Sequence, residues 1–114
     1  MSLQSFRLHG VEIEQKRVAI TDKQTHTLVS VTAGQKAKVL RLVVAAKQEC
    51  KFVIQTGSEG VRDVFIGSDA HPFIEEGQDF RWPIFVGNDS SDVTIYQSDL
   101  TTCDASAYVQ YRAE

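Results

Sequence analysis

Apolar and polar residues alternate along most of this chain. The alternation is plainest at residues 34–57, where two apolar runs flank a charged break at residues 47–49. Alternation with a period of two places successive side chains on opposite faces of a sheet, whereas helical spacing is nowhere sustained. The pattern therefore predicts an all-β chain, in which residues 34–57 supply two adjoining strands.

Further alternating runs predict strands on both sides of this pair. Residues 6–14 change parity at Gly10, which is typical of a β-bulge. The other predicted strands are residues 16–21, 25–32, 61–66, 79–87, 92–97 and 107–111. Residues 57–60 read as a hairpin turn, and residues 67–77 as an irregular loop. Eight or nine short strands separated by turns predict one antiparallel β-sandwich, jelly-roll-like, over residues 1–114, with residues 1–24 as an N-terminal arm or edge strands.

The first strand of the central pair is apolar on both faces. Leu40, Leu42 and Val44 share one parity, and Val39 and Val43 share the other. A strand with one solvated side alternates more cleanly, so we expect another protein to cover the second face. The predicted partner interface combines outward apolar positions with a basic rim: Lys36, Lys38, Val39, Arg41, Val43, Lys47, Val53, Phe85 and Tyr96.

Composition fits one soluble domain. The chain has 114 residues, of which 42% are hydrophobic and 24% charged, and no apolar run approaches the ~18 residues of a membrane span. Since the N-terminus has no apolar stretch of the ~7 residues that a secretory signal needs, we expect synthesis in a cytoplasm and no membrane partner. In that compartment Cys50 and Cys103 are expected to be free thiols.

Charge divides the sequence into two halves. Residues 1–57 carry nine Lys or Arg and four Asp or Glu, a net of +5, whereas residues 58–114 carry three and eleven, a net of −8. The favoured interpretation is that strands from both halves interleave and mix these charges. The alternative is a pair of complementary fields that set the register of packing against a partner. Nucleic acid is not an expected partner, because the sequence pI is about 5.6.

Candidate catalytic and metal-binding residues are sparse. His9, His26 and His71 lie in separate segments without a second ligand at metal-binding spacing. The loop at residues 88–92 offers oxygen ligands but lacks the spacing of an EF-hand. Glu75 and Glu76 are adjacent and would point to opposite faces of a strand, although a polar loop is the favoured interpretation. We therefore predict no catalytic residues, no metal and no cofactor.

The rhythm of residues 28–112 resembles that of short tailed-phage virion proteins of the jelly-roll capsid decoration or cement type. The resemblance rests on the strand KVLRLVVAA at residues 38–46, the Pro-containing run WPIFV at residues 82–86 and the final AYVQY at residues 107–111. It implies a non-enzymatic protein on the capsid exterior that forms homo-oligomers, dimers or trimers, and staples neighbouring major capsid subunits. Residues 6–20 have no counterpart in this pattern.

Two alternatives remain open. A ligand-binding module, such as a tail-fibre tip or a carbohydrate-binding sandwich, requires Trp82, Tyr96 or Tyr108 exposed together in a groove. The parity of Trp82, which it shares with Ile84 and Val86, instead predicts core packing. An enzyme of the cupin kind requires a cluster of His and Glu ligands that the sequence does not supply.

Overall fold

The computed structural model describes residues 3–8, 11–77, 82–99 and 102–114, and all regular structure in these ranges is β. Sheet A contains, from edge to edge, β1 (Leu3–Leu8), β2 (Val11–Ile20), β10 (Ala105–Ala113), β4 (Ala37–Ala46) and, both on the far side of β4, β7 (Phe73–Glu76) and β8 (Phe85–Val86). Sheet B contains β3 (His26–Val29), β9 (Val93–Gln97), β5 (Cys50–Thr56) and β6 (Glu59–Ile66). The predicted antiparallel β-sandwich is confirmed.

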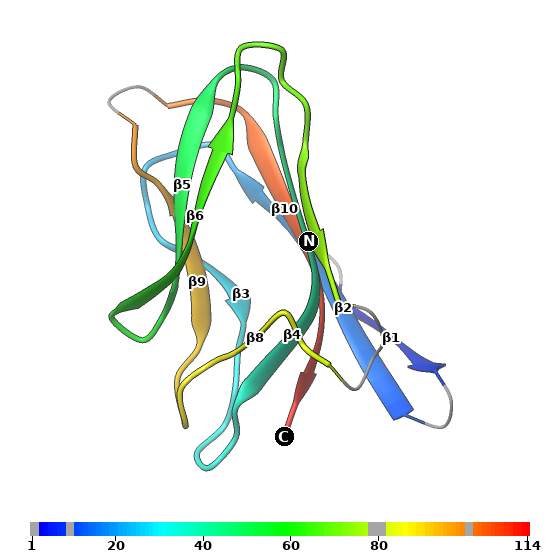
Figure 1. Cartoon of the computed structure of the whole chain (residues 1–114). Coiled ribbons are helices and arrows are strands. Elements are labelled where there is room, and N and C mark those ends of the chain that lie inside the picture. The colour runs from blue at the N-terminus through cyan, green and yellow to red at the C-terminus, as the bar shows by residue number, and fades with distance from the viewer. Residues whose placement is uncertain (1–2, 9–10, 78–81, 100–101) are drawn as a thin grey trace.

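The connections follow the jelly-roll pattern. Strands β2, β10, β4 and β7 succeed one another in sheet A, and strands β3, β9, β5 and β6 succeed one another in sheet B. Each of these four strands of sheet A is therefore connected along the chain to the strand that has the same place in the order of sheet B. The connected pairs are β2 and β3, β9 and β10, β4 and β5, and β6 and β7 (Figure 1). Because strands from the two halves of the sequence alternate within each sheet, residues far apart in the chain become neighbours.

The core lies between the two sheets and is made by the inward residue of each alternating pair. In β5 the inward side chains are Cys50, Phe52 and Ile54, as their parity predicts. In β10 they are Ala107, Val109 and Tyr111, also as predicted. Both strands are flanked by other strands on two sides, so their inward residues are covered in every direction.

The central strand β4 contains a β-bulge that corrects the predicted parity. Opposite β4, Gln110 pairs with Arg41 and Tyr111 pairs with Val39, so Leu40 is an extra residue without a partner on β10. A bulge reverses which residues face inward. Val39 is therefore fully buried in the core rather than outward, and the prediction that it lies at an interface surface was wrong. Leu40 is also buried, although outside the main core cluster.

The N-terminal segment is a hairpin and not a single bulged strand. Strand β1 pairs antiparallel with β2, with Leu8 opposite Val11, so the chain reverses between these two residues. The predicted continuous strand at residues 6–14 was therefore wrong, and Gly10, where the bulge was predicted, lies outside the described residues. Residues 3–8 form one edge of sheet A, the edge-strand alternative for this region.

Of the two predicted loops, one is confirmed and the other contains a strand. The hairpin at residues 57–60 is confirmed: Thr56 pairs with Glu59, and Gly57 takes a positive φ of 60°. The stretch at residues 67–77, predicted as irregular, includes the four-residue strand β7. Of the predicted strand at residues 79–87, residues 79–81 lie outside the described residues, and in the remainder only β8 is a strand.

Candidate docking edge

One edge of the sandwich is closed by the side chain of Arg62. Arg62 takes an inward position at the edge of sheet B, where Ile54 is its cross-strand partner. Its Nε and Nη2 donate to the two carboxylate oxygens of Glu75 on β7, at 2.9 and 3.0 Å. Nη2 also donates to the Ile84 carbonyl at 2.8 Å, and Nη1 to the Val61 carbonyl at 2.8 Å. The guanidinium thus links the free edge of sheet B to the free edge of sheet A.

The Arg62 guanidinium also lies over the ring of Phe85, with 5.3 Å between its central carbon and the ring centroid. Two parallel hydrogen bonds to one carboxylate match the planar shape of the guanidinium, and the aromatic face adds a cation–π contact. The hydrogen bond to Glu75 is the main cause that raises the pKa of Arg62, so the guanidinium stays charged at alkaline pH. We call Arg62, Glu75, Ile84 and Phe85 the edge clasp.

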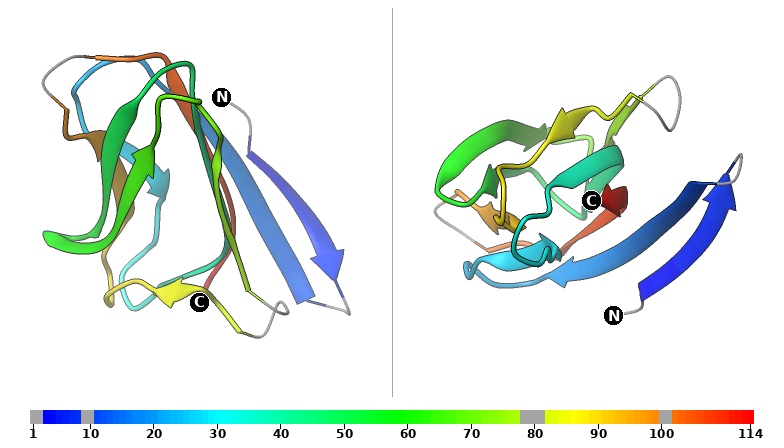
Figure 2. Two further views of the ribbon diagram at one scale, coloured as in Figure 1. Left: turned by 45° about the horizontal axis from the view of Figure 1, so that its top comes forward. Right: turned by 90° about the horizontal axis from the view of Figure 1, so that it is seen from below.

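The exposed large hydrophobic side chains of the described residues belong to the strands at this edge or to the segment between β7 and β8, but Phe65 faces the outer side of sheet B, whereas Ile74 and Val86 face the outer side of sheet A. Phe65 on β6 is 57% exposed, Ile74 on β7 52%, Trp82 on the loop between β7 and β8 69%, and Val86 on β8 44%. Seen from below, β6 (green) and β8 (yellow) lie on one side of the sandwich, and β1 and β2 (blue) on the opposite side (Figure 2, right). We call β6, β7, β8 and residues 82–84 the β6–β8 edge.

On the outer face of sheet A, apolar and charged pairs follow one another along this edge. Ile74 lies opposite Val43. The next outward pair along the strand is Glu76 with Arg41, whose Nε is 3.5 Å from the Glu76 carboxylate. Val86 then lies opposite Lys38 on β4. A surface of this kind offers apolar contact area flanked by charges that fix register, which is the usual anatomy of a protein interface.

Only part of the predicted interface belongs to this edge. Lys38, Arg41 and Val43 lie beside it on the outer face of β4. Lys36 is exposed just before β4, where its backbone bonds to that of Glu114. Lys47 lies beyond the other end of β4 and pairs with Asp104 at 3.4 Å.

The remaining predicted interface residues are elsewhere. Val53 and Tyr96 are cross-strand partners on the outer face of sheet B, which is the opposite face of the sandwich. Phe85, predicted to point outward, instead packs against the core beside Arg62, while Val86, predicted inward, is exposed. The structure therefore divides the predicted set between two faces and the interior.

Trp82 is exposed, and the prediction that it packs in the core was wrong. The prediction assumed a continuous strand through Pro83, but the strand pairing with β4 begins only after the proline, at Phe85. Nor do the three candidate aromatic residues of a ligand groove come together. Tyr96 lies outward on sheet B, whereas Tyr108 lies outward on sheet A beneath Arg17.

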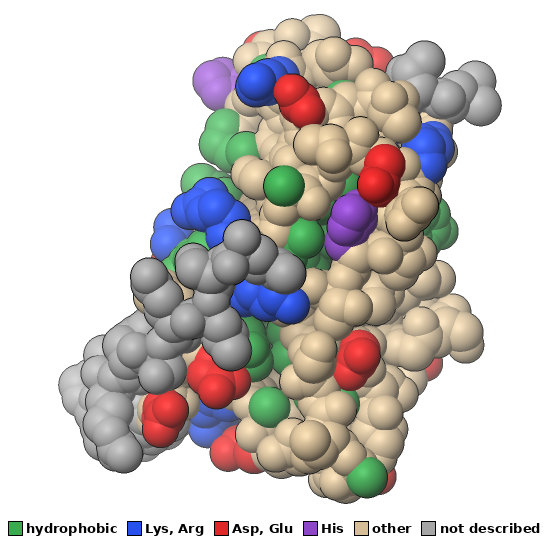
Figure 3. All heavy atoms as spheres, turned by 180° about the vertical axis from the view of Figure 1, so that it is seen from behind, with side chains coloured by type: hydrophobic (Ala, Val, Ile, Leu, Met, Phe, Trp, Pro, Cys, Tyr) green, Lys and Arg blue, Asp and Glu red, His purple; other side chains and the backbone are tan. Residues whose placement is uncertain are grey.

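The charges of the two halves mix across the sheets, as the favoured interpretation predicted. Ion pairs join Lys38 to Glu114, Arg41 to Glu76 and Lys47 to Asp104, and each joins the basic half of the sequence to the acidic half. Viewed from behind, acidic and basic side chains are interspersed (Figure 3). The fold therefore does not separate the basic and acidic halves of the sequence into two complementary charged surfaces.

The histidines that the structure describes lie apart from each other. His26 donates or accepts a hydrogen bond with Asp22 at 2.8 Å, and this bond is the main cause that lowers the pKa of Asp22. His71 is exposed, 3.5 Å from Asp69, and His9 lies outside the described residues. Across the described ranges no three His, Cys, Asp or Glu side chains group together as a metal site. These ranges also hold no helix that could span a membrane.

The clasp was missed at the level of sequence, although a signal for it exists. Val64 and Ile66 set the inward parity of their strand, and Arg62 has the same parity. A charged residue at an inward position needs a partner of opposite charge. Glu75 and Glu76 do point to opposite faces, as expected for an extended segment, but they belong to a strand and not to the predicted loop.

No protein-family model matches the chain, and no curated protein matches it either.

Proposed function

We propose that this chain is a structural protein of a phage virion, which binds the outside of the capsid through its β6–β8 edge and staples neighbouring major capsid subunits. The observation that carries the proposal is that Ile74 and Val86 are exposed on the outer face of sheet A at this edge, and that Trp82, between β7 and β8 in the chain, is exposed as well. Large exposed apolar side chains rimmed by charges mark protein-interaction surfaces. The resemblance of the sequence to jelly-roll capsid decoration proteins supports a capsid as the partner.

Trp82 is the strongest anchor on this surface. Tryptophan is enriched among the few interface residues that dominate binding energy, because it buries a large rigid area and loses little conformational entropy. Trp82 is the most exposed of the four side chains, and it precedes β8 without pairing in the sheet. It can therefore enter a pocket on a partner without disturbing the core.

The edge clasp supports the proposal in a second way. A stapling protein transmits force between subunits, so its binding surface must be fixed to both layers of its scaffold. Arg62 on sheet B holds Glu75 of β7 and the Ile84 carbonyl next to β8, both on the sheet A side. Force applied at Trp82 is thereby shared between the two sheets.

Binding to capsids tests this function directly. The purified protein is mixed with capsids of the phage that encodes it, from which the protein has been stripped, and sedimented. We expect saturable binding with a fixed ratio to the major capsid protein, and self-association to dimers or trimers in solution. A protein that stays monomeric and remains in the supernatant contradicts the proposal.

A second candidate function follows from the exposure of Trp82. A carbohydrate-binding module or tail-fibre tip uses an exposed aromatic ring as a platform for a sugar, and Trp82 is available for this. Tyr96 and Tyr108 do not lie with it, which leaves the platform with one ring. Glycan-array binding that disappears in Trp82→Ala, in a protein that ignores capsids, would favour this second function.

A further inference from the structure

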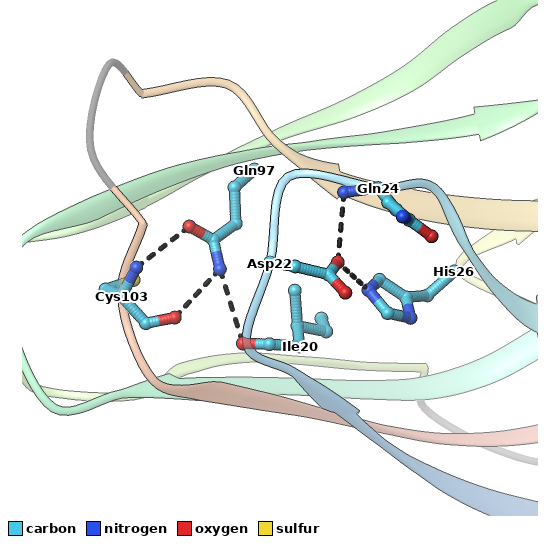
Figure 4. Close-up of polar contacts among 6 residues, drawn as sticks. All are labelled: Ile20, Asp22, Gln24, His26, Gln97 and Cys103. Carbon is cyan, nitrogen blue, oxygen red and sulfur yellow. Dashed lines mark hydrogen bonds and ion pairs between the residues drawn. The ribbon is translucent and has the colours of Figure 1, made fainter.

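A buried amide joins three segments at one end of the sandwich. Gln97 on β9 is 2% exposed. Its Nε2 donates to the carbonyl of Ile20 at 3.3 Å and to that of Cys103 at 2.8 Å, and its Oε1 accepts the Cys103 backbone N–H at 3.0 Å (Figure 4). One side chain thus ties the end of β2 and the segment before β10 to sheet B.

The same amide brings the two cysteines together. The Cys50 thiol donates to Gln97 Oε1 at 3.7 Å, so Gln97 binds Cys50 through its sulfur and Cys103 through its backbone. The nearby Cys50 thiol is also one of the causes that raise the pKa of Cys103. Both residues are buried, and Cys103 is the more accessible at 6% exposed against 0% for Cys50. They are thiols in this structure and not a disulfide.

Oxidation would leave no buried polar group of Gln97 without a partner. A Cys50–Cys103 disulfide removes only the S–H that Cys50 donates to Gln97. Oε1 would keep the Cys103 N–H, and Nε2 would keep its two carbonyls. The usual penalty for a buried acceptor that loses its only donor is therefore avoided.

We propose that Cys50 and Cys103 form a latent disulfide that locks sheet B to sheet A once the protein meets an oxidising environment. Cys50 opens β5 in sheet B, and Cys103 lies two residues before β10 in the middle of sheet A. The bond would close a loop that spans about half of the chain, which restricts the unfolded state strongly. This inference does not depend on the proposed virion function.

The reaction is thiol–disulfide exchange with a small-molecule disulfide such as oxidised glutathione. The Cys103 thiolate attacks one glutathione sulfur, which forms a mixed disulfide and releases one reduced glutathione. The Cys50 thiolate then attacks the Cys103 sulfur and releases the second. Two protein thiols are oxidised to one disulfide, and one glutathione disulfide is reduced to two thiols. The two protons of the protein thiols pass to the two glutathione thiols.

Burial makes this exchange slow in the native state. Desolvation, followed by contact with Cys50 and the charges of Asp99 and Asp104, raises the pKa of Cys103 to about 12. Few thiolates are therefore present at neutral pH, and attack needs a transient opening of this end of the sandwich. The lock should form over hours and then persist.

Peptide mapping of the full chain tests the proposal. The protein is incubated with oxidised glutathione, with and without urea below the unfolding midpoint, and digested without reduction. We expect a Cys50–Cys103 cross-linked peptide, a monomer mass lower by two hydrogens, and an unfolding constant smaller by roughly 100-fold, which dithiothreitol restores.

Two variants serve as controls. Cys50→Ser and Cys103→Ala each leave one thiol, and oxidant should not stabilise either. The wild-type map remains decisive if a variant fails to fold. Thiols that stay free in urea, glutathione adducts that persist on wild-type protein without the cross-link, or disulfides between chains would each overturn the proposal.

Discussion

At the scale of single residues, we expect a charged side chain at an inward position to contribute more to the free energy of unfolding than a charged side chain on the surface. Arg62 makes four hydrogen bonds, three of which cross from sheet B to the sheet A side, and its side chain is 31% exposed. Lys47 makes one ion pair at 3.4 Å with a side chain that is 81% exposed. Surface pairs of the second kind contribute little because water screens both charges.

This contrast gives a matched pair of variants. Arg62→Ala should lower the free energy of unfolding by about 2 kcal/mol, since it leaves Glu75 and the Ile84 carbonyl without their donor. Lys47→Ala should change it by less than about 0.5 kcal/mol. Urea denaturation of the two variants beside the wild type measures both values. Equal losses would show that the clasp is no more than a surface ion pair.

Buried acids give the protein a defined alkaline limit. Burial, with a contribution from Glu14, raises the pKa of Tyr111 to about 12, and burial raises that of Cys103 to about 12. In the unfolded chain these groups ionise near their ordinary values of 10.0 and 9.0. Between pH 9 and pH 12 the unfolded state therefore releases protons that the native state retains, and the free energy of unfolding must fall.

Urea titrations at successive pH values between pH 9 and pH 12 test whether the free energy of unfolding falls as the pH rises. Stability should decline steadily from pH 9 upward, and Tyr111→Phe should make the decline shallower because one of the two groups is removed. A wild-type stability that stays level up to pH 12 would mean that neither group is protected from ionisation in the native state.

At the scale of elements, alternation predicted the strands well but could not locate changes of parity. The inward residues of β5 and β10 follow from period two alone, because both strands are regular where they face the core. In β4 the bulge at Leu40 has no glycine or other local signal, since it arises from the pairing with β10. The facing of the β4 residues before the bulge was therefore predicted wrongly, and Val39 was placed outward although it is buried.

The candidate site was harder to predict than the fold for a related reason. Trp82 and Val86 have the parity of core residues, but the edge strand breaks opposite the bulge: Gly77 bonds to the Leu40 carbonyl and Ile84 to that of Val39. Two adjacent carbonyls of β4 are therefore bonded by residues that lie seven positions apart in the sequence. Which residues become exposed is decided by the neighbouring strand and not by the local sequence.

The tight β5–β6 turn is the element whose sequence requirement is most specific. Gly57 has a φ of +60°, and a Cβ atom there would lie 3.3 Å from Ser91 Oγ. Gly57→Ala should therefore destabilise the protein by about 1 kcal/mol. Gly60→Ala is the control, because a Cβ at that position meets nothing closer than Val53 Cγ1 at 3.9 Å.

Thermal or urea unfolding of the two glycine variants separates conformational strain from general intolerance of the hairpin. Gly60→Ala should leave the unfolding midpoint unchanged or slightly raised, since it reduces the freedom of the unfolded chain. If Gly60→Ala destabilises as much as Gly57→Ala, the left-handed turn is not the cause.

At the scale of the whole molecule, the two edges of the sandwich differ. The β6–β8 edge is closed by the Arg62 clasp and carries the exposed apolar side chains, whereas β1 terminates the opposite edge of sheet A. Because charges of both signs are mixed over the surface, long-range attraction does not select a docking face. We expect local apolar contact at the β6–β8 edge to select it.

The affinity of Trp82→Ala for stripped capsids, measured beside wild type and Tyr96→Ala, tests this account most directly. Tyr96 is the matched control, an aromatic residue on the outer face of sheet B, where β5 separates its strand from β6. We predict that Trp82→Ala weakens capsid binding roughly 30-fold, while Tyr96→Ala changes it by less than about 3-fold. Full binding by Trp82→Ala together with loss of binding by Tyr96→Ala would place the docking surface on the other face and contradict the account.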